Sequence, residues 1–310
     1  MVNLEWGDKE MQLLTGLKIA VIGGDLREKV YIPKLCQLGA EIFVYGNEKL
    51  RDFAEITYCE TLEEINMVDA VVLPLTGISL KGEIHAPCFP YKIFFSTIAN
   101  NLKFLTPIFL GKATPLVKEL AQKLNLPIIE IADDDELAIL NAVPTAEGAL
   151  RLAIELTPYT IHGSRIVILG YGRVGKVAAR LFKSVNAKVT IVARNIKQLA
   201  LAEAFGFETV NFDNKNNAIK YADIIINTIP SKVIDKNDLT NLSTSCVIID
   251  LASQPGGIDY ETARQYDVIA VLASGLPGKV APLTAGEIIS RVLPKLIVQY
   301  FETLSGGQEG

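Results

Sequence analysis

Three glycines in "RIVILGYGRVGKVAARLF" (residues 165–182) constrain the fold more than any other feature of this chain. Gly170, Gly172 and Gly175 stand between a β-branched run and a segment whose apolar residues recur at helical spacing. At this spacing the first glycine makes a tight turn, the second lets the backbone approach a pyrophosphate, and the third lets helix and strand pack closely. The segment therefore predicts a dinucleotide-binding turn rather than a merely structural one, with phosphates held by the helix N-terminus.

Apolar, β-branched segments alternate with helix-like segments along the chain, which is typical of βαβ units around a parallel sheet. One series begins with "LKIAVIGGD" and the other with "RIVILGYG". The remaining expected strands are "EIFVYG", "DAVVLPL", "KFLTPIFLG" and "LPIIEIA" in the first series, and "KVTIVARN", "ADIIINTIP", "CVIIDLAS" and "VIAVLASG" in the second. A chain of 310 residues has room for two domains. We expect an α/β protein with two doubly wound parallel-sheet domains, the second a Rossmann NAD(P)-binding domain.

The segment between the two series indicates the domain boundary. Its apolar residues recur at helical spacing on both sides of Pro144. Because proline disfavours helix at the residue before it, we expect a break near Val143 and a fresh bridging helix from Pro144 to about Leu156. We therefore expect a flavodoxin-like substrate domain over residues 1–143 and an NADP-binding domain, including the bridging helix, over residues 144–283.

The C-terminal segment "TAGEIISRVLPKLIVQYFETL" also has a helical pattern. We expect a helix over residues 284–304 that kinks at Pro294 and packs back on the first domain. The first twelve residues, 1–12, and the tail 305–310 are expected to lie outside the folded domains.

Composition limits the partners. The chain is 49% apolar and 21% charged with a formal net charge of −5, which fits a compact α/β protein and argues against nucleic acid as a partner. No uninterrupted apolar run is long enough to span a membrane, and acidic residues interrupt the N-terminus where a signal peptide would be apolar. We expect a cytoplasmic protein with no membrane partner.

The cysteines are scattered and form no C-x-x-C pair. Only His85 and His162 could accompany them in a metal site. We therefore expect reduced thiols and no metal site. The four cysteines are Cys36, Cys59, Cys88 and Cys246.

The end of the second strand of the second domain indicates which dinucleotide binds. In an NAD site, an acidic residue about 20 residues beyond the glycines accepts the ribose 2′-hydroxyl, whereas a nearby arginine suits a 2′-phosphate. Here Ala193 takes the acidic position and is followed by Arg194 and Asn195. Because guanidinium groups pair strongly with phosphate, NADP is favoured over NAD. The alternative is that Arg194 is an ordinary solvated arginine.

Two further strands of this domain end in "NTIP" and "DLAS". In an open parallel sheet such ends border the ligand crevice, so they are candidates to border the nicotinamide ribose and ring. A simple loop role explains each residue taken alone equally well. The predicted cofactor-binding residues are Gly170, Tyr171, Gly172, Arg173, Val174, Gly175, Ala193, Arg194, Asn195, Thr228, Ile229, Pro230, Leu251 and Ser253.

The opening of the first domain, "VIGGDLREK", lacks the third glycine of a dinucleotide site. It still offers Gly23 and Gly24 at a strand end, before a helix N-terminus. Such a turn could receive a substrate carboxylate, with Arg27 as the charge partner. The alternative is that Asp25 caps the helix and Arg27 is solvated.

Several segments together resemble the A subunits of dipicolinate synthase from spore-forming Firmicutes, from about Leu14 to Leu304. They are "LTGLKIAVIGGD", "NAVPTAEGALRLAI", "YTIHGSRIVILGYGRVGKVAARLF", "NTIPS", "DLASQPGG" and "GLPGKVAPLTAGEII". Two pieces are also similar to D-2-hydroxyacid and alanine dehydrogenases. The resemblance implies NADP-dependent oxidation of a dihydrodipicolinate-type compound to dipicolinate in the mother-cell cytoplasm during sporulation. It also implies the B subunit of dipicolinate synthase as a partner.

Such an oxidation needs residues that position a dicarboxylic pyridine-type molecule and a base that collects a proton. The substrate-binding candidates are Arg27, Thr76 and Ser253, and the catalytic candidates are Thr145 and Glu147, the latter as the base. A carboxylate that merely favours the helix dipole is the alternative for Glu147. We also expect a homo-oligomer.

Two other functions stay open at this point. One is another NADP-dependent two-domain oxidoreductase, such as a 2-keto acid or imine reductase, which would be expected to place a histidine or lysine proton donor at its site. The other is a non-catalytic NADP-binding regulatory subunit, which would bind the nucleotide without turnover.

Overall fold

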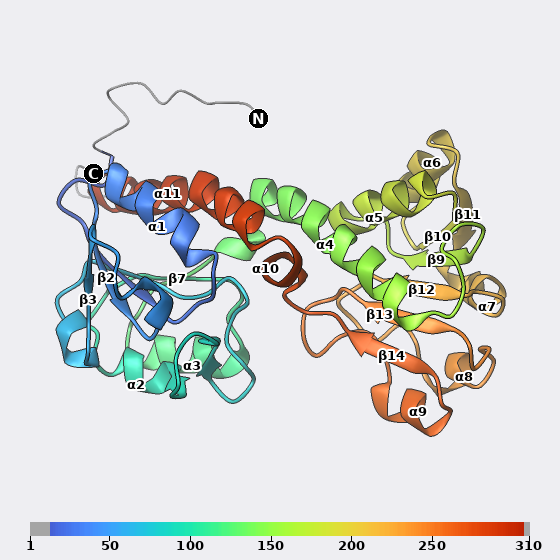
Figure 1. The fold of residues 1–310 in the computed structure, drawn as a ribbon, viewed down its shortest axis with the longest axis horizontal. Coiled ribbons are helices and arrows are strands. Elements are labelled where there is room, and N and C mark those ends of the chain that lie inside the picture. Colours follow the sequence, from blue (N-terminus) through green and yellow to red (C-terminus); the bar gives the residue numbers. More distant parts are fainter. Residues whose placement is uncertain (1–12, 307–310) are drawn as a thin grey trace. The chain divides into compact units, whose positions relative to one another are not determined.

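The computed structural model describes residues 13–306 (Figure 1). The expectations for residues 1–12 and for the end of the tail, 307–310, fall outside the described residues. The chain forms two compact units, the first comprising residues up to Leu137 together with those from Pro282 onward, and the second Ala138–Ala281. The boundary expected at residue 143 lies inside a helix of the second unit.

The first unit is built on a six-stranded parallel sheet in the order β3-β2-β1-β4-β7-β8. Its strands are β1 (Lys18–Ile22), β2 (Glu41–Tyr45), β3 (Ile56–Tyr58), β4 (Ala70–Val72), β7 (Ile108–Leu110) and β8 (Ile128–Glu130). A small antiparallel pair consists of β5 (Glu83–Ile84) and β6 (Ile93–Phe94). The helices are α1 (Glu28–Gln37), α2 (Phe95–Ala99), α3 (Pro115–Lys123), α11 (Pro282–Gly306) and the short 3₁₀ turns η1 (Glu48–Leu50), η2 (Leu62–Ile65) and η3 (Ile131–Asp133).

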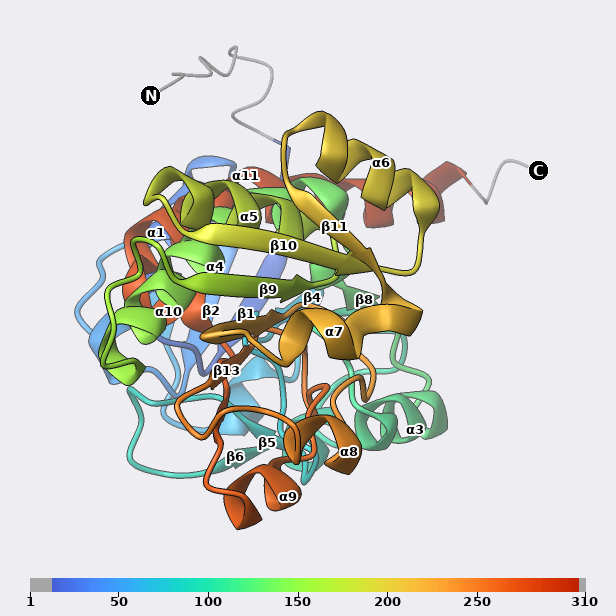
Figure 2. The ribbon, with the colours of Figure 1, turned by 90° about the vertical axis from the view of Figure 1, so that its right-hand side faces the viewer.

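The second unit has the same type of sheet, in the order β11-β10-β9-β12-β13-β14 (Figure 1), and Figure 2 shows β11, β10 and β9 side by side. Its strands are β9 (Arg165–Leu169), β10 (Lys188–Ala193), β11 (Glu208–Asn211), β12 (Ile224–Asn227), β13 (Val247–Asp250) and β14 (Ile269–Leu272). Its helices are α5 (Arg173–Ser184), α6 (Ile196–Ala204), α7 (Lys215–Ile219), α8 (Lys236–Leu239), α9 (Tyr260–Gln265), α10 (Leu276–Val280) and the 3₁₀ turn η4 (Phe212–Asn214). Counted along the unit, this is the 3-2-1-4-5-6 strand order of dinucleotide-binding folds.

The expectation of a flavodoxin-like first domain is wrong. The first sheet has the same 3-2-1-4-5-6 order as the second, whereas a flavodoxin-like sheet runs 2-1-3-4-5. The difference arises from β3, which pairs outside β2 at the sheet edge and spans only Ile56–Tyr58 with no buried residue. Because an edge strand that is not buried on both faces needs no continuous apolar run, the sequence pattern missed both β3 and its counterpart β11.

The expected helix break near Val143 is also wrong, because α4 (Asp135–Leu156) runs through Pro144 without interruption. Pro144 removes only the backbone hydrogen bond to the Leu140 carbonyl, and the next residue, Thr145, adds a side-chain bond by donating its hydroxyl hydrogen to the Asn141 carbonyl oxygen at 2.7 Å. Tight packing of small residues on one face of α4 then holds the helix. These residues are Ala146, Ala149 and Ala153, each with no exposed area.

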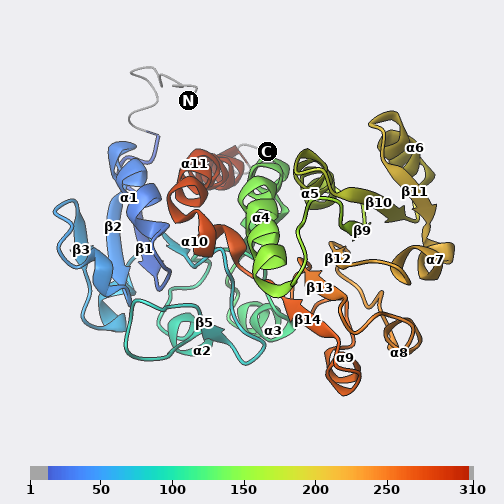
Figure 3. The ribbon, with the colours of Figure 1, turned by 45° about the vertical axis from the view of Figure 1, so that its right-hand side comes forward.

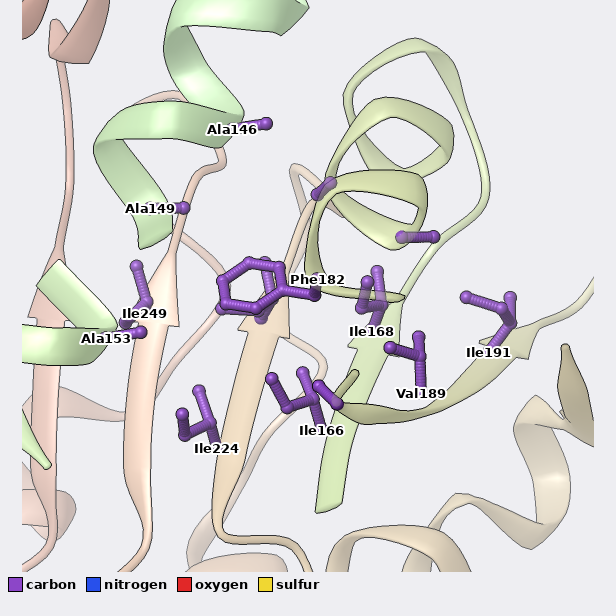
Figure 4. Close-up of a cluster of buried hydrophobic side chains, with 14 of the residues drawn as sticks. Ala146, Ala149, Ala153, Ile166, Ile168, Phe182, Val189, Ile191, Ile224 and Ile249 are labelled. Atoms are coloured by element: carbon purple, nitrogen blue, oxygen red, sulfur yellow. The ribbon is translucent and has the colours of Figure 1, made fainter. Parts of the chain in front are cut away.

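The core of the second unit lies between α4, α5 and one face of the sheet (Figure 4). Phe182 of α5 is fully buried among Ile166 and Ile168 of β9 and the alanines of α4. Burial of a side chain of this size stabilises a fold by roughly 1.5 to 3 kcal/mol. Among the described helices, α4 is the one whose length and apolar composition would suffice to cross a membrane, and its alanine face is the part that packs in this core.

The C-terminal helix α11 belongs to the first unit and lies along α1 (Figure 3). The two helices approach closely at Gly286, where a Cβ would come within 2.6 Å of the Val30 side chain. The helix continues through Pro294 to Gly306, so the first residues of the expected tail are helical.

Candidate functional site

A pocket of about 450 Å³ lies at the carboxyl ends of β9, β10, β12 and β13 in the second unit. This is the edge at which parallel α/β sheets bind ligands. The lining residues are Gly170, Tyr171, Gly172, Arg173, Val174, Ala193, Arg194, Asn195, Gln198, Thr228, Ile229, Pro230, Leu251, Ala252 and Ser253.

Two of the three glycines at its base, Gly170 and Gly175, have the packing roles that their spacing predicts. Gly170 has φ +95°, a left-handed conformation, and a Cβ there would lie 2.5 Å from the Thr228 hydroxyl. A Cβ at Gly175 would lie 2.3 Å from the Gly170 carbonyl oxygen, so only glycine lets α5 begin this close to β9. A Cβ at Gly172, by contrast, would meet nothing within 4 Å. Protein packing therefore explains two of the glycines but not Gly172, whose Cα borders open space.

The N-terminus of α5 has the features of an anion-binding site. Gly172 is its N-cap, and within residues 13–306 no side chain caps the helix by accepting a hydrogen bond from the amides of the first turn. These amides carry partial positive charge from the helix dipole, and Arg173 lines the pocket beside them. The structure therefore fits a pyrophosphate, which the sequence predicts here.

The end of β10 presents an arginine to the pocket. Ala193 ends the strand, and the exposed Arg194 guanidinium lies over the Phe212 ring, 4.3 Å from its centroid. The Asn195 side chain caps α6 by accepting a hydrogen bond from the Lys197 amide at 2.9 Å. None of the described residues that line the pocket is acidic. A 2′-phosphate would meet a positive side chain and no negative one.

The pocket contains every predicted cofactor-binding residue except Gly175, which lies beneath the turn. The sequence reasoning missed Gln198 and Ala252. Gln198 lies one turn after the N-cap Asn195, so the helix-start signal could have identified it. Ala252 carries no chemical signal and lines the pocket through its position between Leu251 and Ser253.

The first unit brings the predicted substrate residues Arg27 and Thr76 together. Arg27 donates from Nε to Asp25 Oδ1 at 2.9 Å and from Nη2 to Asp25 Oδ2 at 2.8 Å. Nη2 also lies 3.4 Å from the Thr76 hydroxyl. The alternative of a solvated Arg27 is wrong, because its side chain is only 2% exposed. Its third terminal group, Nη1, donates to none of the described residues.

A second carboxyl group lies under this pair, and the sequence reasoning missed it. Glu28 is buried and accepts a hydrogen bond from the Asp25 amide at 2.6 Å, folding over Gly24. Burial, and then the Asp25 carboxylate, raise the pKa of Glu28 to about 7. Burial would raise the pKa of Asp25 as well, but the Arg27 guanidinium holds it below its ordinary value. His85 lies at the outer side, with Nε2 3.8 Å from Asp25 Oδ2.

The predicted catalytic residues lie in the interior of α4 rather than at a helix start. Glu147 is exposed and makes no hydrogen bond or ion pair with the described residues. The helix-dipole alternative for Glu147 is wrong, since α4 begins at Asp135. Thr145 uses its hydroxyl hydrogen within the helix, on the Asn141 carbonyl. Neither residue lines the nucleotide pocket.

The thiols of the described residues are all free. Cys59 and Cys246 are buried, and Cys36 and Cys88 are half-buried. Across residues 13–306, no group of three or more histidine, cysteine, aspartate or glutamate side chains could hold a metal ion.

This fold and pocket define the class of two-domain oxidoreductases that bind a nicotinamide nucleotide. The family model "Alanine dehydrogenase/PNT, C-terminal domain" matches residues 152–305. A transhydrogenase from Sinorhizobium meliloti shares the fold, with a TM-score of 0.68 at 13% identity over 92% of this chain and 94% of that one.

Within this class, the family follows from nearer relatives. The family model for the N-terminal domain of the dipicolinate synthase A subunit matches residues 18–132. The A subunit of dipicolinate synthase from Bacillus subtilis is 36% identical, covering 93% of this chain and 98% of the relative. The crystal structure of the dipicolinate synthase A subunit from Bacillus halodurans superimposes with a TM-score of 0.87 at 35% identity, covering 92% of this chain and 99% of that one. The chain belongs to the family of dipicolinate synthase A subunits.

Proposed function

We propose that this chain binds NADP in the pocket of the second unit and uses it to oxidise a dihydrodipicolinate-type compound to dipicolinate. The observation that supports NADP most directly is the end of β10, where Arg194 lines the pocket and none of the described lining residues is acidic. The relatives named as A subunits of dipicolinate synthase support the substrate.

Each part of the pocket has a proposed contact with the cofactor. The uncapped amides of α5 and the open space at Gly172 would receive the pyrophosphate. Arg194, whose guanidinium lies over the Phe212 ring, would pair with the 2′-phosphate. The ends of β12 and β13, from Thr228 and from Leu251 onward, would border the nicotinamide ribose and ring. When bound, the nicotinamide accepts the hydride that the substrate loses.

The first unit would bind a carboxylate of the substrate. Arg27 is held in one orientation by two hydrogen bonds to Asp25, and Nη1 is left to donate to a ligand. The Thr76 hydroxyl lies beside the same guanidinium and would add a second donor. Ser253 is exposed at the edge of the nucleotide pocket and is our third substrate contact.

The oxidation also releases a proton, for which Glu147 remains our candidate base. Its exposed carboxylate is free to accept a proton, since it pairs with none of the described groups. Thr145 can only accept a hydrogen bond from a ligand, because its own hydrogen is engaged by Asn141.

We further propose that the chain works with a dipicolinate synthase B subunit, as a homo-oligomer in the mother-cell cytoplasm.

The Arg194→Ala variant tests the cofactor proposal. Loss of a hydrogen bond to a charged group costs about 1.5 to 3 kcal/mol, so NADP binding should weaken by roughly 10- to 150-fold. NAD binding should change little, because NAD lacks the 2′-phosphate. The matched control is Arg180→Ala, which removes an exposed arginine of α5 that does not line the pocket. Equal losses of NADP and NAD in Arg194→Ala would refute the 2′-phosphate contact.

A further inference from the structure

Two buried polar residues end neighbouring strands next to the nucleotide pocket. Asn227 is the last residue of β12 and Asp250 the last of β13, and the two are paired in register. Neither has any exposed area. A buried carboxyl group is tolerated only when hydrogen bonds replace the water that it loses. The hydrogen-bond donors around Asp250 therefore indicate which parts of the chain this carboxylate holds together.

Four neutral donors surround the Asp250 carboxylate. Oδ1 accepts from Asn227 Nδ2 at 2.9 Å and from the Ala252 amide at 3.0 Å. Oδ2 accepts from the Gly257 amide and from the Tyr260 hydroxyl, both at 2.6 Å. Both oxygens are fully used, so this side chain ties together β12, β13 and the loop that leads to α9.

Both loops that line the pocket at this end depend on the network. Asn227 Oδ1 accepts from the Ile229 amide at 3.0 Å, and Asn227 Nδ2 donates to the Ile229 carbonyl at 3.1 Å. These bonds fix the 228–230 loop. Asp250 fixes the 251–253 loop through the Ala252 amide. Because residues of both loops line the pocket, the network sets the shape of that wall.

Two glycines let the 256–257 loop pass close to these polar groups. Gly256 has φ +88°, and a Cβ there would lie 2.5 Å from the Tyr260 hydroxyl and 2.7 Å from Asp250 Oδ2. A Cβ at Gly257 would lie 2.4 Å from Asn227 Nδ2. The loop must therefore pass directly over the polar groups, and it can do so only with glycine at these positions.

We propose that Asp250, with Asn227 and Tyr260, is a positioning group for the nicotinamide half of the cofactor. This inference rests on the proposed NADP site. The network holds the two loops that would border the nicotinamide ribose and ring, and it touches neither Arg194 nor the first turn of α5. Loss of the network should therefore weaken ligands that carry nicotinamide and spare those that carry only the adenosine phosphates.

The test compares NADP with adenosine 2′,5′-bisphosphate on the full chain by titration calorimetry. Asp250→Asn replaces one of the two accepting oxygens by an NH₂ group, so a backbone amide, that of Ala252 or that of Gly257, loses its acceptor. We expect NADP to bind at least about tenfold more weakly and the bisphosphate to bind as in the wild type. Tyr260→Phe removes one donor and should act in the same direction. The control Asp223→Asn breaks the ion pair with Arg165 before β12 and should change neither ligand.

Three results would overturn this proposal. The first is unchanged NADP binding in Asp250→Asn, and the second is an equal loss of both ligands, which would make the network a general support of the domain. If Asp250→Asn does not fold, the same comparison of NADP with the bisphosphate is made on Tyr260→Phe, and its result decides between these outcomes. The third is a wild-type chain that binds neither ligand, which would overturn the NADP site itself. Normal bisphosphate binding with weakened NADP would separate the two proposals and support this one.

Discussion

Replacement of Glu28 by glutamine should change how the stability of the first unit depends on pH. Glu28 is 2% exposed, and burial together with the Asp25 carboxylate raises its pKa from an ordinary 4.5 to about 7. The folded chain therefore holds this proton more tightly than the unfolded chain. The contribution of Glu28 to the free energy of unfolding is therefore fully present below about pH 4.5. It is lost as the pH rises from about 4.5 to about 7, and above that pH it no longer changes. The pKa difference corresponds to about 3 kcal/mol.

Glutamine cannot ionise, and its side-chain oxygen can still accept the hydrogen bond from the Asp25 amide. We expect the free energy of unfolding of Glu28→Gln, relative to the wild type, to rise by about 2.5 kcal/mol between pH 5 and pH 8, because part of the effect already occurs below pH 5. The assay is urea unfolding of the full chain, monitored by circular dichroism. If the chain unfolds in more than one transition, the free energy is taken from the transition whose midpoint the substitution changes. The matched control is Glu287→Gln, the same substitution at an exposed position on α11. A constant difference for Glu28→Gln would refute the reasoning.

Two further predictions concern the glycine turn and the buried arginine. Gly175→Ala places a methyl group 2.3 Å from the Gly170 carbonyl and should cost about 1 to 3 kcal/mol of stability in thermal unfolding, whereas Gly172→Ala should fold normally and lose only NADP affinity. Normal NADP binding by Gly172→Ala would argue against a pyrophosphate at that position. Arg27→Ala should raise the KM for a dicarboxylate, leave NADP affinity unchanged, and cost about 3 kcal/mol by leaving Asp25 without its partner. An unchanged KM for the dicarboxylate would mean that Arg27 has only a structural role.

The second domain was predictable because its chemistry lies in consecutive residues. A buried parallel strand, three glycines and an amphipathic helix each leave a local pattern, and the pattern specified the turn at Gly170 and the pocket around it. The Arg194 position followed from the same register, counted from the glycines to the end of the next strand. The spacing of residues in the sequence therefore predicted those features that depend on the local backbone conformation.

Other features depend on contacts between distant residues, which no local pattern records. Residues 56–58 form an edge strand only because β2 offers a free edge beside them. Helix α4 passes through Pro144 because its alanine face is packed in the core. The burial of Arg27 depends on Asp25 and on Thr76, which comes from another part of the chain.

The Asn227–Asp250 pair lies between these cases. Both residues stood in the segments "NTIP" and "DLAS", whose neighbours were predicted to line the pocket. Each is a polar residue that directly ends an apolar strand, which is a signal for a buried hydrogen-bonding role. The pairing itself required the register of β12 and β13, which only the structure supplies.

The proposed NADP-dependent oxidation is best tested by titration calorimetry of the purified chain with NADP and with NAD, each in the absence and presence of dipicolinate. We expect NADP to bind more tightly than NAD and dipicolinate to strengthen NADP binding. NADP binding that is indifferent to dipicolinate would contradict the proposed substrate, and failure to bind either nucleotide would mean that the three glycines form only a structural turn.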